Sequence, residues 1–318
     1  MATPATEASA PLFVVINPSS GSNDSARVRE LLSRVFDEAG RAVTFIEVAD
    51  PGQLASVFDQ VGAQAREAGG IVVAVGGDGT INAAANAAIA HGCPLGVIPQ
   101  GTFNLLARDH GIPTDAEAAA RALVRAKASP VQVGSVNGHT FHVNASLGLY
   151  PQLLQDREAF NAQLWRTPWV AVLSALVTLF KWRKQLILDV ECDGQRTVLR
   201  TPMLFVANNR LQMERIGLDV AEAAGTAKGR LAGVVTRPVG SWAMLGLVLH
   251  GALGRLGEAD HVQEFSFQRL EVKVRGRRRV KMATDGEVRI VTPPLTFAVG
   301  SEPLLLMIPA AEDRAPRE

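Results

Sequence analysis

The sequence predicts an α/β protein of two domains, in which a parallel sheet with helices precedes a mostly antiparallel β domain. With 318 residues the chain exceeds the usual size of a single hydrophobic core. Its first part alternates short apolar strands with helical segments, the pattern of a parallel sheet covered on both faces. After about residue 130, alternating strands follow one another instead. We therefore expect one domain over residues 11–130 and a second over 131–309, with the C-terminal segment able to return to the first.

In the first domain, apolar runs predict strands, and apolar residues spaced three and four apart predict helices. Gly40 marks the end of the first helical segment, because glycine commonly follows the last turn of a helix. The third strand runs into a glycine-rich turn before the third helix begins. Strands are expected at 12–16, 42–48, 71–75 and 95–98, and helices at 25–38, 53–68 and 80–90.

In the second domain, Asn137-Gly138 separates two alternating strands and is a strong signal for a tight hairpin. Two apolar helices are expected near 155–182 and 240–257. The other segments with strand character favour antiparallel pairing. They are residues 186–192, 197–207, 231–236, 265–274, 280–284, 288–292 and 304–308.

Composition excludes several classes of protein. A hydrophobic fraction of 47% with 20% charged residues is not that of a disordered chain, a collagen or a coiled coil. The balance of 32 Lys and Arg against 31 Asp and Glu argues against a general affinity for nucleic acid. Cys93 and Cys192 lie far apart, so we expect neither a disulfide framework nor a cysteine metal site, and a reducing compartment fits. Residues 1–11 do not resemble a signal peptide.

The apolar runs are too short to predict a membrane span. The longest, residues 168–180, falls short of the roughly 20 residues that a spanning helix needs. Trp165 and Trp182 flank it, Trp169 lies at its start, basic residues follow it, and Trp242 opens the second apolar segment. Tryptophan at the ends of apolar helices is typical of an anchor at the membrane interface, but the same residues could fill a protein core. Both interpretations stay open.

The turn Gly76-Gly77-Asp78-Gly79-Thr80 lies where a buried strand meets a helix. Glycines let the backbone approach a phosphate closely, and the helix N-terminus adds partial positive charge. An aspartate beside a phosphate makes sense if Mg²⁺ stands between them. The alternative is a tight turn in which Asp78 caps the helix.

Two further loops follow strands of the same expected sheet, at residues 17–21 and 99–104. Each alone could be an ordinary turn. Ligands of open parallel sheets bind at the carboxyl ends of the strands. Three glycine-bearing loops at that edge therefore predict a floor of N–H and hydroxyl donors for a nucleotide polyphosphate.

These motifs together resemble the diacylglycerol kinase catalytic family, which includes bacterial soluble lipid kinases and the sphingosine and ceramide kinases. The pattern N-P-x-S-G begins at Asn17, G-G-D-G-T at Gly76 and G-T-x-N-x-x-A-R at Gly101. The segments 144–148 and 285–287 also fit at their expected distances. The resemblance implies an N-terminal nucleotide-binding domain, a C-terminal β-sandwich that binds lipid, and the use of ATP and Mg²⁺.

The resemblance also implies roles for individual residues. Asp78 would act through Mg²⁺. Glu287 would be the base that accepts the proton of the lipid hydroxyl, with Asp285 as its partner, although the two roles could be exchanged and turn chemistry alone could explain both. The expected nucleotide-binding residues are Asn17, Pro18, Ser20, Gly21, Gly76, Gly77, Gly79, Thr80, Gly101, Thr102 and Asn104.

Four positions depart from the family pattern. Leu105 and Gln132 stand where relatives commonly carry acids of the network around the metal, and Ala49 replaces a threonine. The stretch 227–231 replaces the turn near which a structural metal is usually bound, and Lys228 could supply the missing charge. We therefore expect no structural Mg²⁺ there.

Residues 273–281, KVRGRRRVK, form a basic hairpin just before Asp285. It can be read as a solvated turn or as a segment that attracts anionic lipid headgroups.

The function expected from the sequence is an ATP-dependent lipid kinase acting on a diacylglycerol- or sphingoid-type lipid. The alternatives are a relative of the NAD kinases and a nucleotide- or lipid-binding protein whose catalysis has decayed. The expected location is the cytoplasm, with peripheral attachment to a membrane and no nucleic-acid partner. An exposed edge strand in the second domain would permit a homodimer.

Overall fold

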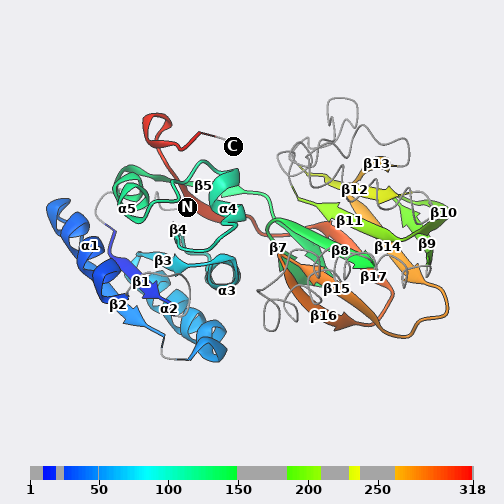
Figure 1. Cartoon of the computed structure of the whole chain (residues 1–318), viewed down its shortest axis with the longest axis horizontal. Coiled ribbons are helices and arrows are strands. Elements are labelled where there is room, and N and C mark those ends of the chain that lie inside the picture. The colour runs from blue at the N-terminus through cyan, green and yellow to red at the C-terminus, as the bar shows by residue number, and fades with distance from the viewer. Residues whose placement is uncertain are drawn as a thin grey trace, which may run out of the picture. The chain divides into compact units, whose positions relative to one another are not determined.

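The structure is a computed structural model that describes residues 10–18, 25–48, 50–148, 185–208, 229–236 and 262–316 (Figure 1). The two expected apolar helices, all four tryptophans, Ala49 and Lys228 lie outside these residues. Within them, no helix is long and apolar enough to cross a membrane. The chain divides into two compact units, one of residues 1–132 with 301–318 and one of residues 133–300.

The first unit is a six-stranded sheet with the order β2-β1-β3-β4-β18-β5. Its first five strands are parallel, and β5 runs antiparallel to β18. The central strand β3 is buried at every residue, as its uninterrupted apolar run predicts. The strands are β1 (Leu12–Ile16), β2 (Val43–Glu47), β3 (Ile71–Gly76), β4 (Leu95–Pro99), β5 (Lys127–Val131) and β18 (Leu304–Ile308).

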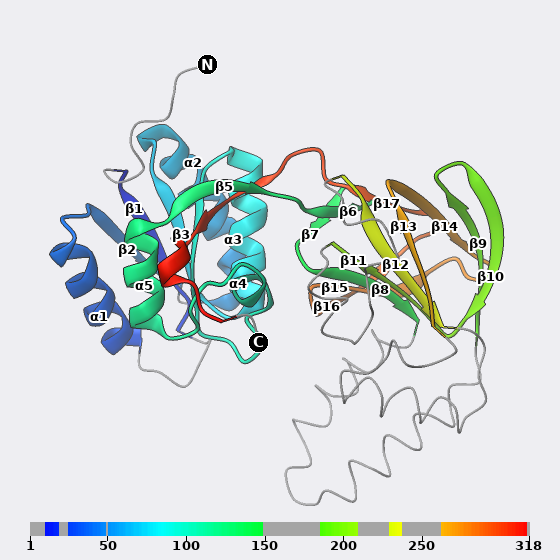
Figure 2. The same ribbon diagram turned by 90° about the horizontal axis from the view of Figure 1, so that it is seen from above.

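Helices cover both faces of this sheet. Figure 2 shows α1 and α5 on one face and α2 and α3 on the other. The third helix begins at Asp78, two residues before the expected start, and α4, α5 and β5 were not expected. The helices are α1 (Ser25–Glu38), α2 (Leu54–Ala68), α3 (Asp78–His91), α4 (Leu105–Asp109) and α5 (Ala116–Arg125), with short 3₁₀ turns at Pro51–Gln53 and Ala311–Asp313.

The second unit contains two antiparallel six-stranded sheets. One has the order β10-β9-β14-β17-β6-β7, and the other has the order β13-β12-β11-β8-β15-β16. The strands of the first are β6 (Gly134–Val136), β7 (His139–Phe141), β9 (Leu186–Cys192), β10 (Gln195–Thr201), β14 (Arg269–Val274) and β17 (Leu295–Val299). Those of the second are β8 (Asn144–Gly148), β11 (Met203–Ala207), β12 (Leu231–Thr236), β13 (Val262–Phe267), β15 (Val280–Thr284) and β16 (Glu287–Val291).

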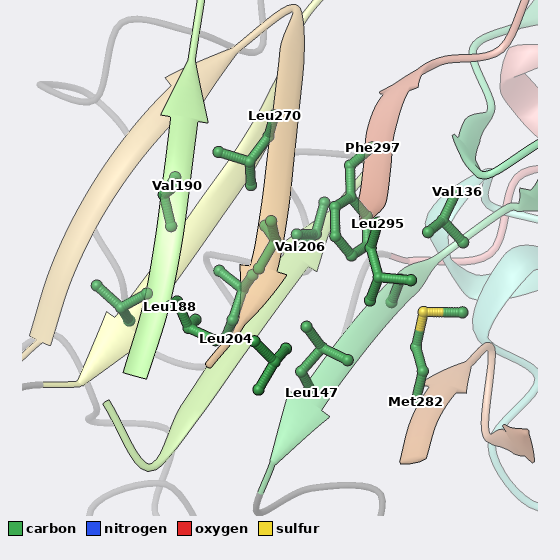
Figure 3. Packing of buried hydrophobic residues seen from close by; sticks show 14 of the residues in the cluster. Val136, Leu147, Leu188, Val190, Leu204, Val206, Leu270, Met282, Leu295 and Phe297 are labelled. Carbon is green, nitrogen blue, oxygen red and sulfur yellow. The ribbon is translucent and has the colours of Figure 1, made fainter. Parts of the chain in front are cut away.

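The core of this unit lies between its two sheets. Leu188, Val190 and Phe297 from one sheet share a buried cluster with Leu147 and Val206 from the other (Figure 3). Alternate residues of each strand supply this cluster, as expected for a β-sandwich. The predicted fold class, a parallel α/β domain followed by an antiparallel β domain, is confirmed.

Two strands expected as single runs each divide in two. Pro202 interrupts residues 197–207, because proline has no N–H to donate to a ladder. Gln268 interrupts residues 265–274, where the chain passes from one sheet to the other. The strand at 304–308 joins the sheet of the first unit, which is the return of the C-terminal segment that the sequence allowed.

Arg230 ties three segments of the sandwich together. Its guanidinium donates to the Asp193 carboxylate at 2.9 Å, to the Ser266 carbonyl at 2.9 Å and to the Ser266 hydroxyl at 3.2 Å. The Asp193 carboxylate also accepts the backbone N–H groups of Gln268 and Arg269. A side-chain cation, Arg230, thus lies within the stretch 227–231 where a structural metal was considered. Lys228 lies outside the described residues, so its role stays a prediction.

Arg230→Met is therefore expected to lower the free energy of unfolding by about 1 kcal/mol, since it removes a half-exposed network of charged hydrogen bonds. Urea unfolding followed by circular dichroism measures this loss. Arg196→Met, which removes an exposed ion pair with Glu191, is the control and should cost less than about 0.5 kcal/mol. We also expect EDTA to leave the wild-type midpoint unchanged, and a lower midpoint would show that a structural cation is present after all.

Candidate functional site

Three loops meet at the carboxyl edge of the first sheet. They follow β1, β3 and β4, which are neighbours in that order in the sheet. Ile16 pairs with Val75 and Gly76 pairs with Pro99, so the three strands end at the same level. Asn17 after β1 donates its side-chain amide to the Thr80 hydroxyl at 2.9 Å. Gln100 after β4 donates its N–H to the Gly76 carbonyl at 2.8 Å. The structure therefore brings three of the predicted loops together, as far as their residues are described.

Close contacts explain two of the glycines in these loops, at the Thr80 side chain for Gly76 and at the Gly77 backbone for Gly101. A Cβ on Gly76 would lie 2.6 Å from the Thr80 hydroxyl oxygen. A Cβ on Gly101 would lie 2.9 Å from the Gly77 Cα and 2.9 Å from the Asn104 side-chain oxygen. Real Cβ atoms do not tolerate such distances, so larger residues would push the loops apart.

The Asp78 carboxylate joins two of these loops. It accepts the N–H of Asn104 at 3.0 Å on Oδ2 and the N–H of Leu105 at 2.7 Å on Oδ1. Asn104, whose φ of 50° is left-handed, bonds in turn to the N–H and the carbonyl of Gly101 through its side chain, each at 2.8 Å. Asp78 is the first residue of α3, the residue before it makes no side-chain cap, and its own hydrogen bonds go to the neighbouring loop. Asp78 therefore does not cap its own helix, and its carboxylate instead meets the N–H groups at the start of α4.

The N-terminus of α3 lies within this cluster of loops. The first N–H groups of a helix have no partner inside the helix, and they carry partial positive charge suited to an anion. Gly79 and Thr102 are exposed, Thr80 and Asn104 are buried, and Pro18 is exposed. Ser20 and Gly21 lie outside the described residues, so their role stays a prediction.

The residues of this cluster fit a magnesium nucleotide better than a metal held by protein alone. Among the described residues, no group of three His, Cys, Asp or Glu side chains could hold a metal ion. Each Asp78 oxygen accepts one N–H and keeps a further lone pair. Mg²⁺ commonly takes one or two carboxylates and completes its shell with phosphates and water. Asp78 can serve as such a carboxylate.

Asp285 forms the second candidate centre, in the sandwich unit. It opens the two-residue turn between β15 and β16, with φ of 48° at Asp285 and 87° at Gly286. Its Oδ1 accepts the N–H groups of Val143 at 2.8 Å and Asn144 at 3.0 Å, and its Oδ2 accepts that of His142 at 2.8 Å. The carboxylate is thus fixed by the backbone of the segment before β8.

Burial raises the pKa of Asp285 to about 6 from its ordinary value of 3.8, and the charge of Glu287 adds to the shift while the three N–H donors oppose it. A pKa near 6 suits a group that accepts a proton near neutral pH. Glu287 differs, because its side chain is 45% exposed and bound to Arg289 at 2.8 Å. Of the two carboxylates, Asp285 is therefore the one that backbone donors hold in a buried position, and Glu287 is the half-exposed one. Which of them acts as the base stays a prediction.

Several buried polar atoms around Asp285 were missed by sequence reasoning. His142 and Asn144 are each 4% exposed, and Ser146 is fully buried. Among the described residues, no hydrogen-bond partner is found for four atoms: both ring nitrogens of His142, the side-chain oxygen of Asn144 and the hydroxyl of Ser146. Burial without a partner is costly, so such atoms commonly mark a site that a ligand or water completes. The sequence did contain a signal for these atoms, because polar residues stand at every second position of the otherwise apolar segment 142–146.

Asn208 supports the backbone that holds Asp285. Its side-chain amide donates to the His142 carbonyl at 3.0 Å, and its N–H donates to the Val143 carbonyl at 3.0 Å. Asp285 returns a bond to the same segment, since its N–H donates to the Asn144 carbonyl at 2.9 Å. Residues far apart in sequence therefore fix the position of this carboxylate.

His142 and Asp285 make opposite contributions to the pH dependence of stability. Burial lowers the pKa of His142 from 6.5 to about 4, so the stability it contributes is complete above pH 6.5 and is lost as the pH falls toward 4. The pKa of Asp285 is raised, so its contribution is complete below pH 3.8 and is lost as the pH rises through about 6. Each shift of about two units is worth about 3 kcal/mol.

The two contributions should nearly cancel in the wild type and separate in variants. Asp285→Asn leaves the histidine alone, so its stability relative to wild type should fall by about 3 kcal/mol between pH 7 and pH 4. His142→Gln leaves the aspartate alone and should show a relative gain of similar size over the same range. Urea unfolding at four pH values measures both differences. Parallel curves for the three proteins would contradict these assignments.

The first of these two centres lies in a part of the chain that matches a known family of protein domains. Residues 11–136 match the family model of the diacylglycerol kinase catalytic domain, which confirms the resemblance seen in the motifs. A diacylglycerol kinase of Bacillus subtilis strain 168 is 33% identical over 45% of this chain and 47% of its own length. A probable YegS-like lipid kinase of Cronobacter sakazakii is 31% identical over 44% of this chain and 46% of its own. The chain thus spans about half the length of the curated relatives it matches.

Solved structures share the whole fold. The crystal structure of a diacylglycerol kinase from Bacillus anthracis str. Sterne superimposes with a TM-score of 0.65 over 95% of this chain and 97% of that chain, at 14% identity. Another crystal structure from the same organism gives a TM-score of 0.73 over 95% and 98%, at 17% identity. At such identities the likeness concerns the fold alone.

Proposed function

We propose that this protein is a lipid kinase that transfers the γ-phosphoryl group of ATP to the hydroxyl of a diacylglycerol- or sphingoid-type lipid. The observation that carries the proposal is the joining of three strand-end loops around the N-terminus of α3 by Asn17, Asp78 and Asn104. Such an edge offers N–H donors and helix charge to a polyphosphate. The catalytic-domain match and the names of the relatives support the lipid as acceptor.

In the proposed reaction the first unit binds and orients the nucleotide. The N–H groups at the start of α3 and the glycine backbone would receive phosphate oxygens, with the Thr80 hydroxyl beside them. Asp78 would hold the loop of residues 100–105 in place and offer its remaining lone pairs to Mg²⁺. Bound Mg²⁺ would supply neutralisation of phosphate charge.

The second unit would supply the base. Asp285 would accept the proton of the lipid hydroxyl while that oxygen attacks phosphorus, and its pKa near 6 leaves it ionised at neutral pH. The unpartnered polar atoms of Asn144 and Ser146 would bind polar groups of the acceptor. We assign Glu287 a supporting role at the exposed end of the turn. The identification of the two units as nucleotide and lipid domains is part of this proposal.

The decisive experiment incubates the purified protein with γ-labelled ATP, Mg²⁺ and mixed micelles that contain diacylglycerol, ceramide or sphingosine in separate reactions. Label in a lipid product is the expected result. Label transferred to NAD instead would show an NAD kinase. Calorimetric binding of ATP without any product would show a binding protein whose catalysis has decayed. Leu105 and Gln132, which stand where the family pattern has acids, would explain that outcome. Absence of ATP binding would overturn the proposal.

A further inference from the structure

The loop that joins β14 to β15, residues 275–279, carries four arginines at one end of the sandwich. We call it the arginine loop. Arg277, Arg278 and Arg279 are exposed, and their side chains have no hydrogen bond or ion pair within the part of the chain that the structure describes. Arginine side chains left free in a short turn create a concentrated positive field, because each guanidinium stays charged at any physiological pH.

Two acidic residues on the strands next to the arginine loop are already paired. Asp189 on β9 binds Arg275, with its carboxylate 2.6 Å from the guanidinium, and Glu271 on β14 binds Lys273 at 3.3 Å. Neither of these two carboxylates therefore offsets the charge of Arg277, Arg278 and Arg279. The whole chain carries a net charge of only +1, so this charge is a local feature and not part of a general basic surface.

An exposed isoleucine lies beside the arginine loop. Ile290 on the edge strand β16 is 67% exposed, and it pairs directly with Lys281, two residues after the loop ends. Among the described residues, the large hydrophobic side chains that are exposed are Phe103, Val198 and Ile290. Ile290 is the one of these that stands next to free arginines.

We propose that the arginine loop and Ile290 dock this protein on an anionic lipid bilayer. Basic residues are attracted to the negative surface of such a bilayer, and an adjacent aliphatic side chain can enter the boundary between headgroups and acyl chains. A nucleic acid suits this surface less well, because the loop has no aromatic side chain on which a base could stack. The proposal names a partner for the same protein but does not require the proposed reaction.

The test is sedimentation of the protein with lipid vesicles in the absence of nucleotide. One set of vesicles is phosphatidylcholine alone, and the other also contains about 30 mol % of the anionic lipid phosphatidylserine. The variant R277Q/R278Q/R279Q is expected to bind anionic vesicles about 100-fold more weakly, since each basic residue contributes about fivefold. Ile290→Ser should cost about tenfold on the same vesicles. Wild-type binding should be absent from neutral vesicles and should weaken as salt is raised.

Two matched variants test whether vesicle binding depends on the position of the positive charges or only on their number. R27Q/R196Q/R269Q removes three exposed arginines from α1 and from the opposite end of the sandwich, and it should bind like wild type. R277K/R278K/R279K keeps the charge and should bind within a few fold of wild type. Equal losses in both glutamine triples would overturn the assignment to this loop. Unchanged binding in R277Q/R278Q/R279Q would do the same.

Further outcomes distinguish membrane docking from nucleic-acid binding and from the proposed kinase activity. Tighter binding of the loop to an RNA or DNA oligonucleotide than to anionic vesicles would overturn it in favour of a nucleic acid. Turnover of a monomeric short-chain diacylglycerol, if the protein is a kinase, should be equal in wild type and R277Q/R278Q/R279Q, because docking is then unnecessary. Vesicle binding by a protein that shows no kinase activity would leave the docking inference standing while the proposed function fails.

Discussion

Asp285→Asn is expected to lower kcat of the proposed kinase about 10³-fold without weakening the fold at pH 7. General-base catalysis is typically worth 10²–10⁴ in rate, and asparagine cannot accept the proton. The backbone donors around the residue stay in place, since Val143 and Asn144 can still bond to the side-chain oxygen. The measurement is a steady-state assay with the best lipid acceptor, together with a urea unfolding curve.

The expected stability of Asp285→Asn follows from two opposing changes. Asparagine presents an amide group to the N–H of His142, so one buried donor loses its acceptor at a cost of about 1–3 kcal/mol. The substitution also removes a buried charge whose raised pKa corresponds to about 3 kcal/mol at pH 7. These changes nearly cancel or leave the variant slightly more stable. A residue that mattered only for the turn would instead lose stability and activity together.

Glu287→Gln is the matched control, because it changes the other carboxylate of the same turn. Glu287 is half-exposed and its partner is Arg289, so the loss of its charge should alter kcat by less than about fivefold. The pH profile adds a second readout. Wild-type activity should fall as the pH drops below about 6, and the activity of Glu287→Gln should fall over the same pH range. A large loss in Glu287→Gln with little loss in Asp285→Asn would return the role of base to Glu287.

The fold could be predicted from the sequence where the spacing of apolar residues and the residues typical of turns indicated the same element boundaries. The run at residues 71–75 became the central buried strand, and Asn137-Gly138 became the predicted hairpin between β6 and β7. The division of the strands near Pro202 and Gln268 was missed because each neighbouring pair shares one apolar pattern, while the partner sheet changes. The strand β5, KASPV, was missed because its residues are only partly buried and include a proline.

The site could be predicted at the level of motifs but not of contacts. The loops after β1, β3 and β4 meet because parallel strands end at one edge, a rule that the sequence allows one to apply. That the Asp78 carboxylate binds the N–H groups of Asn104 and Leu105 depends on the left-handed conformation of Asn104, which no pattern indicates. The burial of Asp285 depends on residues 142–144 and 208, which lie far away in the chain.

Asp78→Ala is expected to weaken ATP binding by about 100-fold or more and to reduce turnover at least as much. The change leaves the N–H groups of Asn104 and Leu105 without their acceptor, and hydrogen bonds to charged groups are worth about 1.5–3 kcal/mol each. Residues 100–105 then lose the contact that holds them against α3, and any Mg²⁺ loses a carboxylate. Calorimetric titration with ATP, with and without Mg²⁺, measures both effects.

A comparison with Asp115 decides whether Asp78 acts as more than a helix cap. Asp115 caps α5 in the same unit, since its carboxylate accepts the N–H of Ala118 at 2.9 Å. Asp115→Ala should therefore cost about 1 kcal/mol of stability and leave ATP affinity unchanged. If Asp78→Ala behaves like Asp115→Ala, the loops form a structural turn and the nucleotide must bind elsewhere. If ATP affinity falls mainly in the presence of Mg²⁺, the carboxylate serves the metal. A fall in both conditions instead shows that its main task is to hold residues 100–105 in the shape that receives phosphate.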